Sequence, residues 1–411
     1  MAIVKPFKGV RPSRDKVALV SSKSYEAYTP AELGAKLDFN PFTFLHVINP
    51  GYKYHQEISG EQRFQMVQNR YEEFKENKIF VRDNLPSFYI YETSDFHNSF
   101  CGIIAATSVV DYKDGYIKKH EGTLHKREVL FETYLKSTGF NAEPVLLMHE
   151  DNAEFQRFID HIKSERPEYE FSTTDKKLHR LWLVQEPDRI KRIISFFESI
   201  DALYIADGHH RTASSSLLAD DLEEENQQHT GEEDYNFFMS YLIPESHLKI
   251  AEFNRLIKDL NGYTVDEFLM KLDTYFRIEN RGQNLYKPSR KHHFSMYLNG
   301  EFYSLYLRKN QYTFDDALSR LDTEVIYRTV LKPILGIDDL NHNNRIGYTN
   351  NQLDMLSIKT NVDNGNYKVG FGLVPITIEE MKEIADAELK MPPKTSYIEP
   401  KLRSGLIMYE F

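Results

Sequence analysis

The chain of 411 residues contains one cysteine, Cys101, and one tryptophan. A single cysteine excludes an intramolecular disulfide and a zinc site built from several cysteines. The neighbours of Cys101 are apolar, in the run Phe100-Cys101-Gly102-Ile103-Ile104. We therefore expect a buried and unreactive thiol.

The sequence also lacks long apolar runs and an excess of positive charge. No apolar run approaches the roughly 20 residues that cross a bilayer, and residues 1–6 lack the apolar core of a signal peptide. The formal charge of −11 works against a general affinity for nucleic-acid backbones. We expect a cytoplasmic, soluble protein without a membrane or DNA partner. The sequence does not indicate its oligomeric state.

Several familiar catalytic signatures are missing: the Gly-x-x-x-x-Gly-Lys-Ser/Thr loop, the Gly-x-Gly-x-x-Gly fingerprint, the Gly-x-Ser-x-Gly elbow and the His-Glu-x-x-His metal pair. What is present is an ordinary globular composition, with 41% hydrophobic and 27% charged residues, including 26 Tyr and 27 Phe. Such a chain can bury a large core in two or three lobes.

The apolar pattern alternates between strand and helix from about residue 100 to 220, which predicts an α/β fold of mixed α+β type. Predicted helices span residues 60–78, 126–136, 153–164 and 187–199, with others near 266–275, 315–331 and 377–389. Predicted strands span residues 88–91, 102–112, 144–148 and 179–185. Further expectations are a turn entering a strand at 40–47, an acidic loop at 220–234, a strand at 237–244 that begins a further lobe, and a hairpin at 293–307.

One turn gathers residues suited to holding phosphate, Asp207-Gly208-His209-His210-Arg211. Residues 202–206 before it predict a strand, and residues 212–219 after it predict the start of a buried helix. At such a junction the first helical N–H groups lack partners and the helix dipole adds partial positive charge. Gly208 lets a ligand approach, Arg211 offers a planar charged fork, and the histidines can exchange protons. The turn predicts a phosphate or nucleotide cradle; a helix start capped by its aspartate is the alternative.

A second polar stretch, residues 117–128, contains His120 and Glu121 ahead of a predicted helix. If the fold brings Glu121 to the cradle, it can take a proton from a substrate hydroxyl as a general base. The alternative is a solvated loop carboxylate, which is the usual state of an isolated glutamate.

Further residues are candidates for binding the substrate. Those near the predicted helix are His120, Lys126, Arg127, Ser137 and Thr138, for which an exposed helix face and a glycine helix stop are the alternatives. Those near the C-terminus are Lys394, Ser396 and Lys401, in a segment rich in lysine and hydroxyl residues. This segment is either an anion-binding loop that folds over the site or an ordinary surface loop before a last strand at 406–411.

Two of these motifs carry a resemblance to a known family. Residues 205–211 resemble the phosphate-binding motif of the archaeal free-serine kinases, members of the ParB/sulfiredoxin superfamily. Lys119-His120-Glu121, followed by a helix and Thr138-Gly139, resembles the segment with their catalytic glutamate. The order agrees, but the interval between the motifs is longer here, and residues from about 151 to 200 would be an insertion.

Nearly the whole chain also resembles a large bacterial and archaeal family catalogued as the domain of unknown function numbered 1015. The matching segments are residues 5–12, 40–47, 120–123, 207–211 and 394–406. One departure is Ser24-Tyr25-Glu26-Ala27, where that family usually has a sequence like Pro-Tyr-Asp-Val. If this segment touches the substrate, specificity differs here.

The resemblance implies a ParB/sulfiredoxin-like core at residues 101–220. An N-terminal α+β lobe at 1–100 and a C-terminal α+β lobe at 221–411 would flank this core. It also implies a serine kinase-like phosphotransferase, acting on free L-serine with ATP or ADP and Mg²⁺, or running from O-phosphoserine to serine in serine biosynthesis. The choice among ATP, ADP and pyrophosphate, the acceptor and the metal ligands stay open.

The implied roles fall on the two motifs. Glu121, Asp207 and His209 would be catalytic, and residues from Gly208 through His209, His210 and Arg211 to Thr212 would bind phosphate. Asp207 would either orient the histidines or help to position Mg²⁺. The alternative function is a ParB-like nucleotide-dependent DNA-binding protein or a regulatory protein without turnover. The acidic charge and the lack of a basic helix-turn-helix pattern argue against DNA binding.

Overall fold

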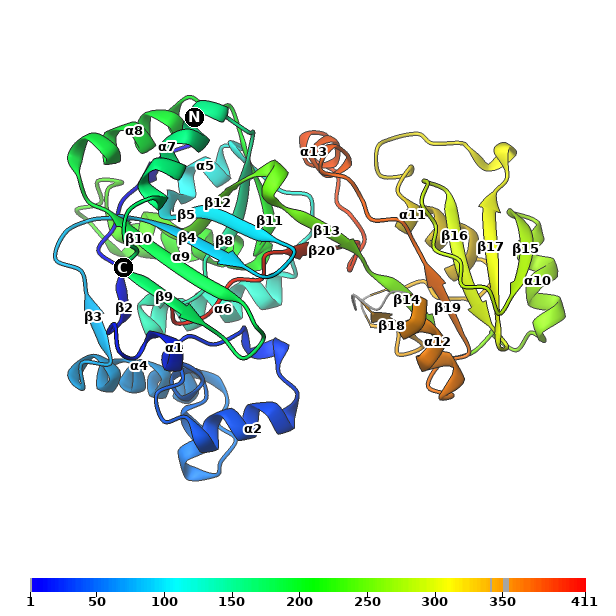
Figure 1. Cartoon of the computed structure of the whole chain (residues 1–411), viewed down its shortest axis with the longest axis horizontal. Coiled ribbons are helices and arrows are strands. Elements are labelled where there is room, and N and C mark those ends of the chain that lie inside the picture. Colours follow the sequence, from blue (N-terminus) through cyan, green and yellow to red (C-terminus); the bar gives the residue numbers. More distant parts are fainter. Residues whose placement is uncertain (1, 341, 350–354) are drawn as a thin grey trace. The chain divides into compact units, whose positions relative to one another are not determined.

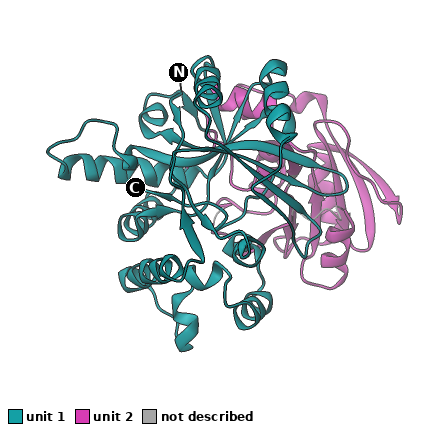
Figure 2. Cartoon of the chain, turned by 60° about the vertical axis from the view of Figure 1, so that its left-hand side comes forward, with its two compact units in different colours: residues 1–119, 123–248, 400–411 teal, residues 120–122, 249–399 magenta. Residues whose placement is uncertain are grey.

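The computed structural model describes residues 2–340, 342–349 and 355–411, which form two compact units (Figures 1 and 2). Unit 1 comprises residues 1–119, 123–248 and 400–411, and unit 2 comprises residues 120–122 and 249–399. The chain thus leaves unit 1 twice, once for three residues and once for a long segment.

Unit 1 is built on a mixed sheet of nine strands in the order β6-β11-β8-β12-β5-β4-β10-β9, with β1 also beside β5. The strands are β1 (Val4–Lys5), β4 (Phe88–Ser94), β5 (Ser99–Ser108), β6 (Ile117–Lys118), β8 (Val145–His149), β9 (Tyr169–Ser172), β10 (Leu178–Val184), β11 (Leu203–Asp207) and β12 (Phe237–Pro244). β6 runs parallel to β11, and β8 runs parallel to β12, whereas the other pairs are antiparallel.

Five helices of unit 1 accompany this sheet. They are α5 (Val109–Lys113), α6 (His125–Thr138), α7 (Ala153–Lys163), α8 (Pro187–Glu198) and α9 (His209–Glu225), with short turns η3 (Asp234–Asn236) and η4 (Glu245–His247). Phe155 and Ile159 of α7 and Ile193 and Phe197 of α8 are buried in the core, at the spacing of one helix face. Seven of the eight residues of β12 are buried, as expected for a central strand covered on both faces.

A second core in unit 1 is formed by the N-terminal segment with the end of the chain. Its elements are β2 (Val10–Pro12), α1 (Val17–Val20), η1 (Tyr25–Ala27), α2 (Pro30–Phe39), α3 (Leu45–Ile48), η2 (Pro50–Tyr54), α4 (Gly60–Glu76), β3 (Phe80–Arg82), β7 (Phe140–Asn141) and β21 (Tyr409–Glu410). β2 pairs with β3, and β7 pairs with β21. Segments far apart in the sequence therefore close this part of the unit.

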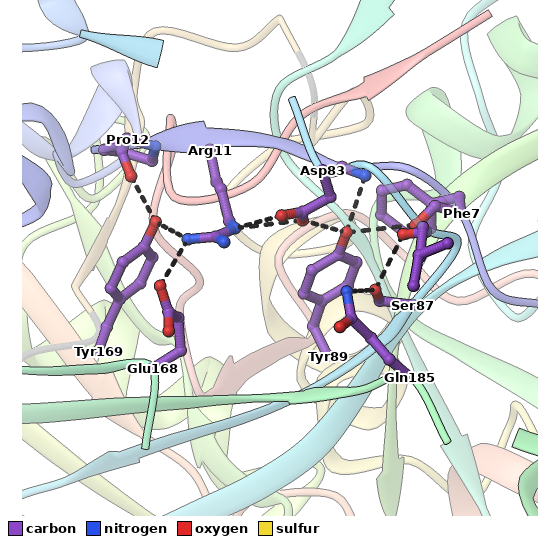
Figure 3. A network of polar contacts seen from close by, with 11 residues as sticks. Phe7, Arg11, Pro12, Asp83, Ser87, Tyr89, Glu168, Tyr169 and Gln185 are labelled. Carbon is purple, nitrogen blue, oxygen red and sulfur yellow. Dashed lines mark hydrogen bonds and ion pairs between the residues drawn. The ribbon is translucent and has the colours of Figure 1, made fainter. Parts of the chain in front are cut away.

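A buried polar network fastens residues 5–12 to the sheet (Figure 3). Arg11 Nε lies 2.9 and 3.1 Å from the two carboxylate oxygens of Asp83, and Arg11 Nη1 donates to Glu168 at 3.1 Å. The Tyr89 hydroxyl donates to Asp83 and accepts from the backbone N–H of Gly9, both at 2.7 Å. A Cβ at Gly9 would lie 2.6 Å from that hydroxyl, so a larger residue would have to displace the Tyr89 side chain. The motif at residues 5–12 thus has a structural role.

Unit 2 contains an antiparallel sheet of six strands in the order β15-β17-β16-β19-β14-β18 and a separate pair, β13 with β20. The strands are β13 (Lys249–Glu252), β14 (Asn254–Ile257), β15 (Phe276–Gly282), β16 (His293–Leu298), β17 (Glu301–Leu307), β18 (Ile346–Thr349), β19 (Val369–Gly372) and β20 (Ser396–Glu399). The helices are α10 (Val265–Asp273), η5 (Lys309–Gln311), α11 (Asp322–Ile326), the π-helical η6 (Tyr327–Leu331), α12 (Met355–Asp363) and α13 (Ile378–Asp386).

The mixed α/β fold class is confirmed, and so are the elements with a strong local pattern. The predicted helix at 60–78 is α4, the helix at 187–199 is α8, and the hairpin at 293–307 is β16 and β17 around Asn299-Gly300, both with positive φ. No described helix has both the length and the apolar character to span a membrane.

Four expectations about helices, strands and loops were wrong. Residues 45–48 form helix α3 rather than a strand, because Phe44 and Val47, three positions apart, are both buried in the second core. Residues 109–113 form α5 after the strand ends, and residues 315–321 are not helical. The acidic residues from 220 to 225 continue α9 as its exposed end rather than forming a loop.

The predicted lobes at residues 1–100, 101–220 and 221–411 stay a prediction. The predicted insertion at about 151–200 also stays a prediction. The two compact units of the structure have other boundaries than these lobes. In particular, residues 237–244 form β12 inside the sheet of unit 1, between β8 and β5, rather than beginning a further lobe.

Candidate functional site

The two polar stretches of the sequence start from one edge of the unit 1 sheet. Ile117 and Lys118 of β6 pair in parallel with Leu203 and Tyr204 of β11. Because the strands are parallel, their carboxyl ends lie at the same edge, where ligands of open α/β sheets bind. The segment that begins at Lys119 and the turn that begins after β11 both leave this edge.

The turn after β11 depends on a left-handed glycine. Gly208 has φ 104° and ψ 26° and forms the N-cap of α9, and no described side chain caps this helix. A Cβ at Gly208 would lie 3.3 Å from Arg211 Nε and 3.4 Å from the Cα of Val145. The N-cap of α9 is therefore Gly208 and not the aspartate, so the interpretation of Asp207 as the cap is wrong.

Asp207, the last residue of β11, forms an ion pair with Lys401 at 2.9 Å. Burial raises the pKa of Asp207, but the nearby positive charges of Lys401 and Arg211 outweigh burial and hold the pKa below its usual value. The carboxylate is thus charged at neutral pH. Its side chain is 40% exposed and therefore accessible.

The two histidines of the turn differ in burial. His209 is buried, which lowers its pKa to about 4, although Asp207 acts in the opposite direction. His210 is half-buried, and burial followed by the charge of Arg127 lowers its pKa. His209 is therefore neutral at pH 7, so attraction for anions must come from other groups.

Arg211 supplies one of these groups. Its guanidinium donates to the carbonyl of Pro144 at 2.5 Å and lies 3.7 Å from the carboxylate of Glu143, whose other oxygen accepts from the Ser404 hydroxyl. The Arg211 side chain is one-third exposed, and its fork has more donors than these contacts use. Lys119 is exposed, and its charge also acts on His209.

The first turn of α6 lies beside the first turn of α9. A hydrogen bond from Thr123, followed by contact with His125 and the charge of His210, lowers the pKa of Glu128, although burial opposes the shift. Arg127 also acts on His210. Two helix N-termini, each with polar side chains, thus meet at the same edge of unit 1.

The hydroxyl groups of two candidates form hydrogen bonds to the backbone of their own helices. The hydroxyl of Thr138 donates to the carbonyl of Tyr134 at 2.8 Å, and that of Thr212 donates to the carbonyl of Gly208 at 3.2 Å. Both residues are buried. Gly139, with φ 71°, ends α6, so the helix-stop interpretation accounts for this position. Ser137 is half-buried, and Lys126 and Arg127 are exposed.

Four other candidates belong to unit 2: His120, Glu121, Lys394 and Ser396. The carbonyl of His120 accepts from the N–H of Met391 at 2.8 Å, and Glu121 forms a parallel bridge with Met391. His120 is buried and Glu121 is exposed. Lys394 is exposed, and Ser396 begins β20.

Sequence reasoning did not include Lys119, Glu128 or Glu143 among the site residues. Each lies outside the turn at residues 207–211. They come close to this turn only through the pairing of β6 with β11 and the packing of the first turns of α6 and α9. Among the described residues, no group of three or more His, Cys, Asp or Glu side chains is arranged to hold a metal ion.

Some solved structures are similar to this chain at low sequence identity. Similar structures include C-terminally truncated SbnI from Staphylococcus aureus, at 10% identity and TM-score 0.40, covering 74% of this chain and 85% of that one. A mutant free serine kinase in complex with AMP gives 11% identity and TM-score 0.37, covering 74% and 91%. A conserved hypothetical protein from Pyrococcus furiosus gives 13% identity and TM-score 0.31, covering 73% and 91%.

No curated protein matches the sequence. A family model described as "Protein of unknown function (DUF1015)" matches residues 4–324, which is most of the chain. The protein therefore belongs to the DUF1015 family.

Proposed function

We propose that this protein is a phosphotransferase that moves a phosphoryl group between a nucleotide and the hydroxyl of free L-serine. The observation that carries the proposal is the shared sheet edge in unit 1, from which the Lys119 segment and the Gly208 turn both start. This edge gathers the N-terminus of α9 and the positive charges of Lys119, Arg211 and Lys401. Phosphoryl transfer depends mainly on such positioning and charge stabilisation.

The phosphates of ATP or ADP would bind at the Gly208 turn. The backbone N–H groups of His209, His210 and Arg211 would donate to phosphate oxygens, and the Arg211 fork would add charge-assisted hydrogen bonds. Neutral His209 would act as a hydrogen-bonding group rather than as a cation. Thr212 would contribute through its place in the helix, since its hydroxyl is bonded to Gly208.

Glu121 would act as the general base. Its carboxylate would take the proton of the serine hydroxyl while the serine oxygen forms a bond to the γ-phosphorus and the bond to the β–γ bridging oxygen breaks, which releases ADP. In the reverse reaction, from O-phosphoserine to ADP, the protonated Glu121 would return the proton to the serine oxygen. Glu121 follows Lys119 by two positions in the chain.

Mg²⁺ would accompany the nucleotide. Asp207 fits a hard cation because it is charged and accessible, although it is paired with Lys401. Mg²⁺ commonly uses one or two carboxylates together with substrate phosphates, so a dedicated protein cage is not required. The ion would neutralise charge on the phosphates, and Asp207 would hold it or orient His209. Lys126, Arg127, Lys394, Ser396 and Lys401 stay candidates for contacts to the substrate.

The test is a product assay on the purified chain with Mg²⁺. One reaction contains L-serine with ATP or ADP, and the other contains O-phosphoserine with ADP. We expect phosphoserine in the first and ATP in the second. Nucleotide binding without any product would instead support a regulatory sensor, and a salt-dependent shift of duplex DNA would support the ParB-like alternative.

The Glu121→Gln variant tests the proposed base. We expect it to lose most of the turnover, roughly 100-fold or more, because the amide cannot take the hydroxyl proton. Its dissociation constant for nucleotide should change little. Glu198→Gln, which changes an exposed glutamate at the end of α8, is the matched control and should keep full activity. Near-normal turnover in Glu121→Gln would rule out Glu121 as the base.

A further inference from the structure

Unit 2 contains a buried arginine that has no carboxylate partner among the residues that the structure describes. Arg255 lies in β14, between β18 and β19, and is 2% exposed. Its guanidinium donates to the carbonyls of Phe253 and Lys394 and lies 5.6 Å from the centre of the Tyr348 ring. Burial lowers the pKa of Arg255 to about 10, so the side chain is still charged at neutral pH.

The contrast with the buried arginine of unit 1 is informative. Arg11 has Asp83 at 2.9 Å and Glu168 at 3.1 Å. For Arg255, the described residues supply backbone carbonyls and an aromatic ring, and no carboxylate. A buried cation without a counter-charge is costly, because carbonyl dipoles replace only part of its hydration. An anionic ligand would remove that cost.

A second unpaired cation lies next to it. The Lys394 ammonium lies 5.4 Å from the centre of the Phe253 ring, while Arg255 bonds to the carbonyl of the same phenylalanine. Lys394 is exposed, and no described carboxylate pairs with it. Its backbone has φ 56°, which is unusual for a residue with a side chain, and the Thr395 hydroxyl donates to the Pro392 carbonyl at 2.6 Å. The turn thus holds Lys394 beside Arg255.

We propose that Arg255 and Lys394 form a binding site for one oxyanion group, a phosphate or a carboxylate, in unit 2. The guanidinium fork matches two oxygens of either group and has more donors than its carbonyl contacts use. The exposed ammonium would attract the ligand and contact its outer oxygen. This site uses residues of unit 2 alone, so it does not depend on the nucleotide cradle of unit 1.

The experiment measures anion binding in the full chain with the cradle disabled by Arg211→Ala. Thermal unfolding is followed while inorganic phosphate or acetate is titrated at constant ionic strength with chloride. We expect a saturable rise of the melting temperature, because a ligand that binds only the folded state stabilises it. A response to phosphate alone assigns a phosphate site, and a response to acetate alone assigns a carboxylate site.

Variants show whether the response belongs to this site. In the Arg211→Ala background, Lys394→Gln should weaken the apparent affinity roughly 10-fold, as loss of one charged hydrogen bond does. The control is Lys271→Gln, which changes an exposed lysine lying 4.7 Å from the centre of the Tyr263 ring in the same unit. This variant should keep the apparent affinity for the anion unchanged. Arg255→Met should abolish the response and keep a stable fold, because it removes a buried unpaired charge.

If Arg255→Met does not fold, Lys394→Gln still shows whether the anion binds at this site. No saturable response to either anion, or a response equal in Lys394→Gln and in Lys271→Gln, would overturn the proposal. The product assay with the unmodified cradle tests the phosphotransferase separately, so either idea can fail without the other.

Discussion

At the scale of single residues, Arg211 links the Gly208 turn to the strand beside it. It bonds to Pro144, lies near Glu143 and passes over Gly208, whose missing side chain leaves room for it. These contacts fix the guanidinium before any ligand binds. A pre-positioned charge binds phosphate with little loss of conformational freedom.

Arg211→Ala should therefore weaken nucleotide binding. The loss of one or two charge-assisted hydrogen bonds, about 1.5–3 kcal/mol, corresponds to a roughly 10- to 100-fold higher dissociation constant. Isothermal titration with ATP and ADP measures it. Arg192→Ala, which removes an exposed arginine paired with Glu154, is the control. An unchanged dissociation constant in Arg211→Ala would count against the cradle.

Lys401→Gln should change the pH dependence of activity. In the present structure burial raises the pKa of Asp207, and Lys401 is the first of the groups that lower it. Without Lys401 the pKa of Asp207 rises, so the carboxylate takes up its proton at a higher pH. If charged Asp207 is required, the acid limb of the kcat/KM profile moves to higher pH.

The control for this shift is Lys136→Gln, which removes an exposed lysine that pairs with Glu225 at 2.7 Å. It should leave the acid limb in place. A limb that does not move in Lys401→Gln would show that Asp207 is not the titrating group. Lys401 and Asp207 were both named as candidates from the sequence, whereas their ion pair was not foreseen, because the two residues come together only through the fold.

At the scale of elements, local patterns were enough for some parts of the structure. The helices α4, α7 and α8 each have apolar residues on one face, and the Asn299-Gly300 turn predicts its hairpin without distant information. The turn from β11 into α9 was also foreseen, because an apolar strand, a glycine and a buried helix follow one another directly.

Pairing between distant elements could not be foreseen in this way. β12 is inserted between β8 and β5, and β6 pairs with β11, from which it is separated by α6 to α8. The apolar pattern of β12 shows that it is a buried strand but not which strands it joins. This is why the shared edge of the two motifs, and the roles of Glu128 and Glu143, emerge only from the fold.

The polar network around Arg11 joins several elements of unit 1, and its contribution to the free energy of unfolding can be measured. Arg11→Met leaves Asp83, whose side chain is 6% exposed, without its counter-charge. We expect the free energy of unfolding to fall by about 3–5 kcal/mol, the usual cost of breaking a buried pair. Urea unfolding followed by the fluorescence of Trp182 measures this loss in unit 1, because Trp182 is the one tryptophan and is buried in β10.

Two further variants test the cause. Arg11→Met with Asp83→Asn should recover part of the loss, since the uncompensated charge is gone. Lys16→Met removes an exposed pair with Asp15 and should cost at most about 1 kcal/mol. A cost for Arg11→Met as small as that of Lys16→Met would show that the network does not hold the N-terminal segment.

At the scale of the whole molecule, buried histidines make the stability of unit 1 sensitive to acid. Unit 1 buries three histidines, and burial lowers their pKa values to about 4 for His149, about 3 for His179 and about 4 for His209. All three are neutral in the folded unit at neutral pH. The usual pKa of an unfolded histidine is about 6.5, so the unfolded chain takes up these protons first as the pH falls.

The free energy of unfolding of unit 1 should therefore be unaffected by these groups above about pH 6.5 and should fall below it. Each histidine contributes a slope of up to roughly 1.4 kcal/mol per pH unit, until the pH reaches its folded pKa. Urea midpoints followed by Trp182 at pH 7, 6 and 5 measure the loss. Carboxylates also titrate as the pH falls, so the comparison between variants is more decisive than the curve of the native chain alone.

His149→Leu removes one of the three titrations while keeping a side chain of similar volume against Phe196 and Phe197. Its unfolding free energy should fall less steeply between pH 6 and 5 than that of the native chain, because one fewer proton is taken up on unfolding. His125→Leu, at a histidine whose side chain is 81% exposed, should keep the native slope. Parallel slopes for His149→Leu and the native chain would mean that the buried histidine is protonated inside the folded unit. Acid sensitivity would then have to come from the other two buried histidines and from the carboxylates.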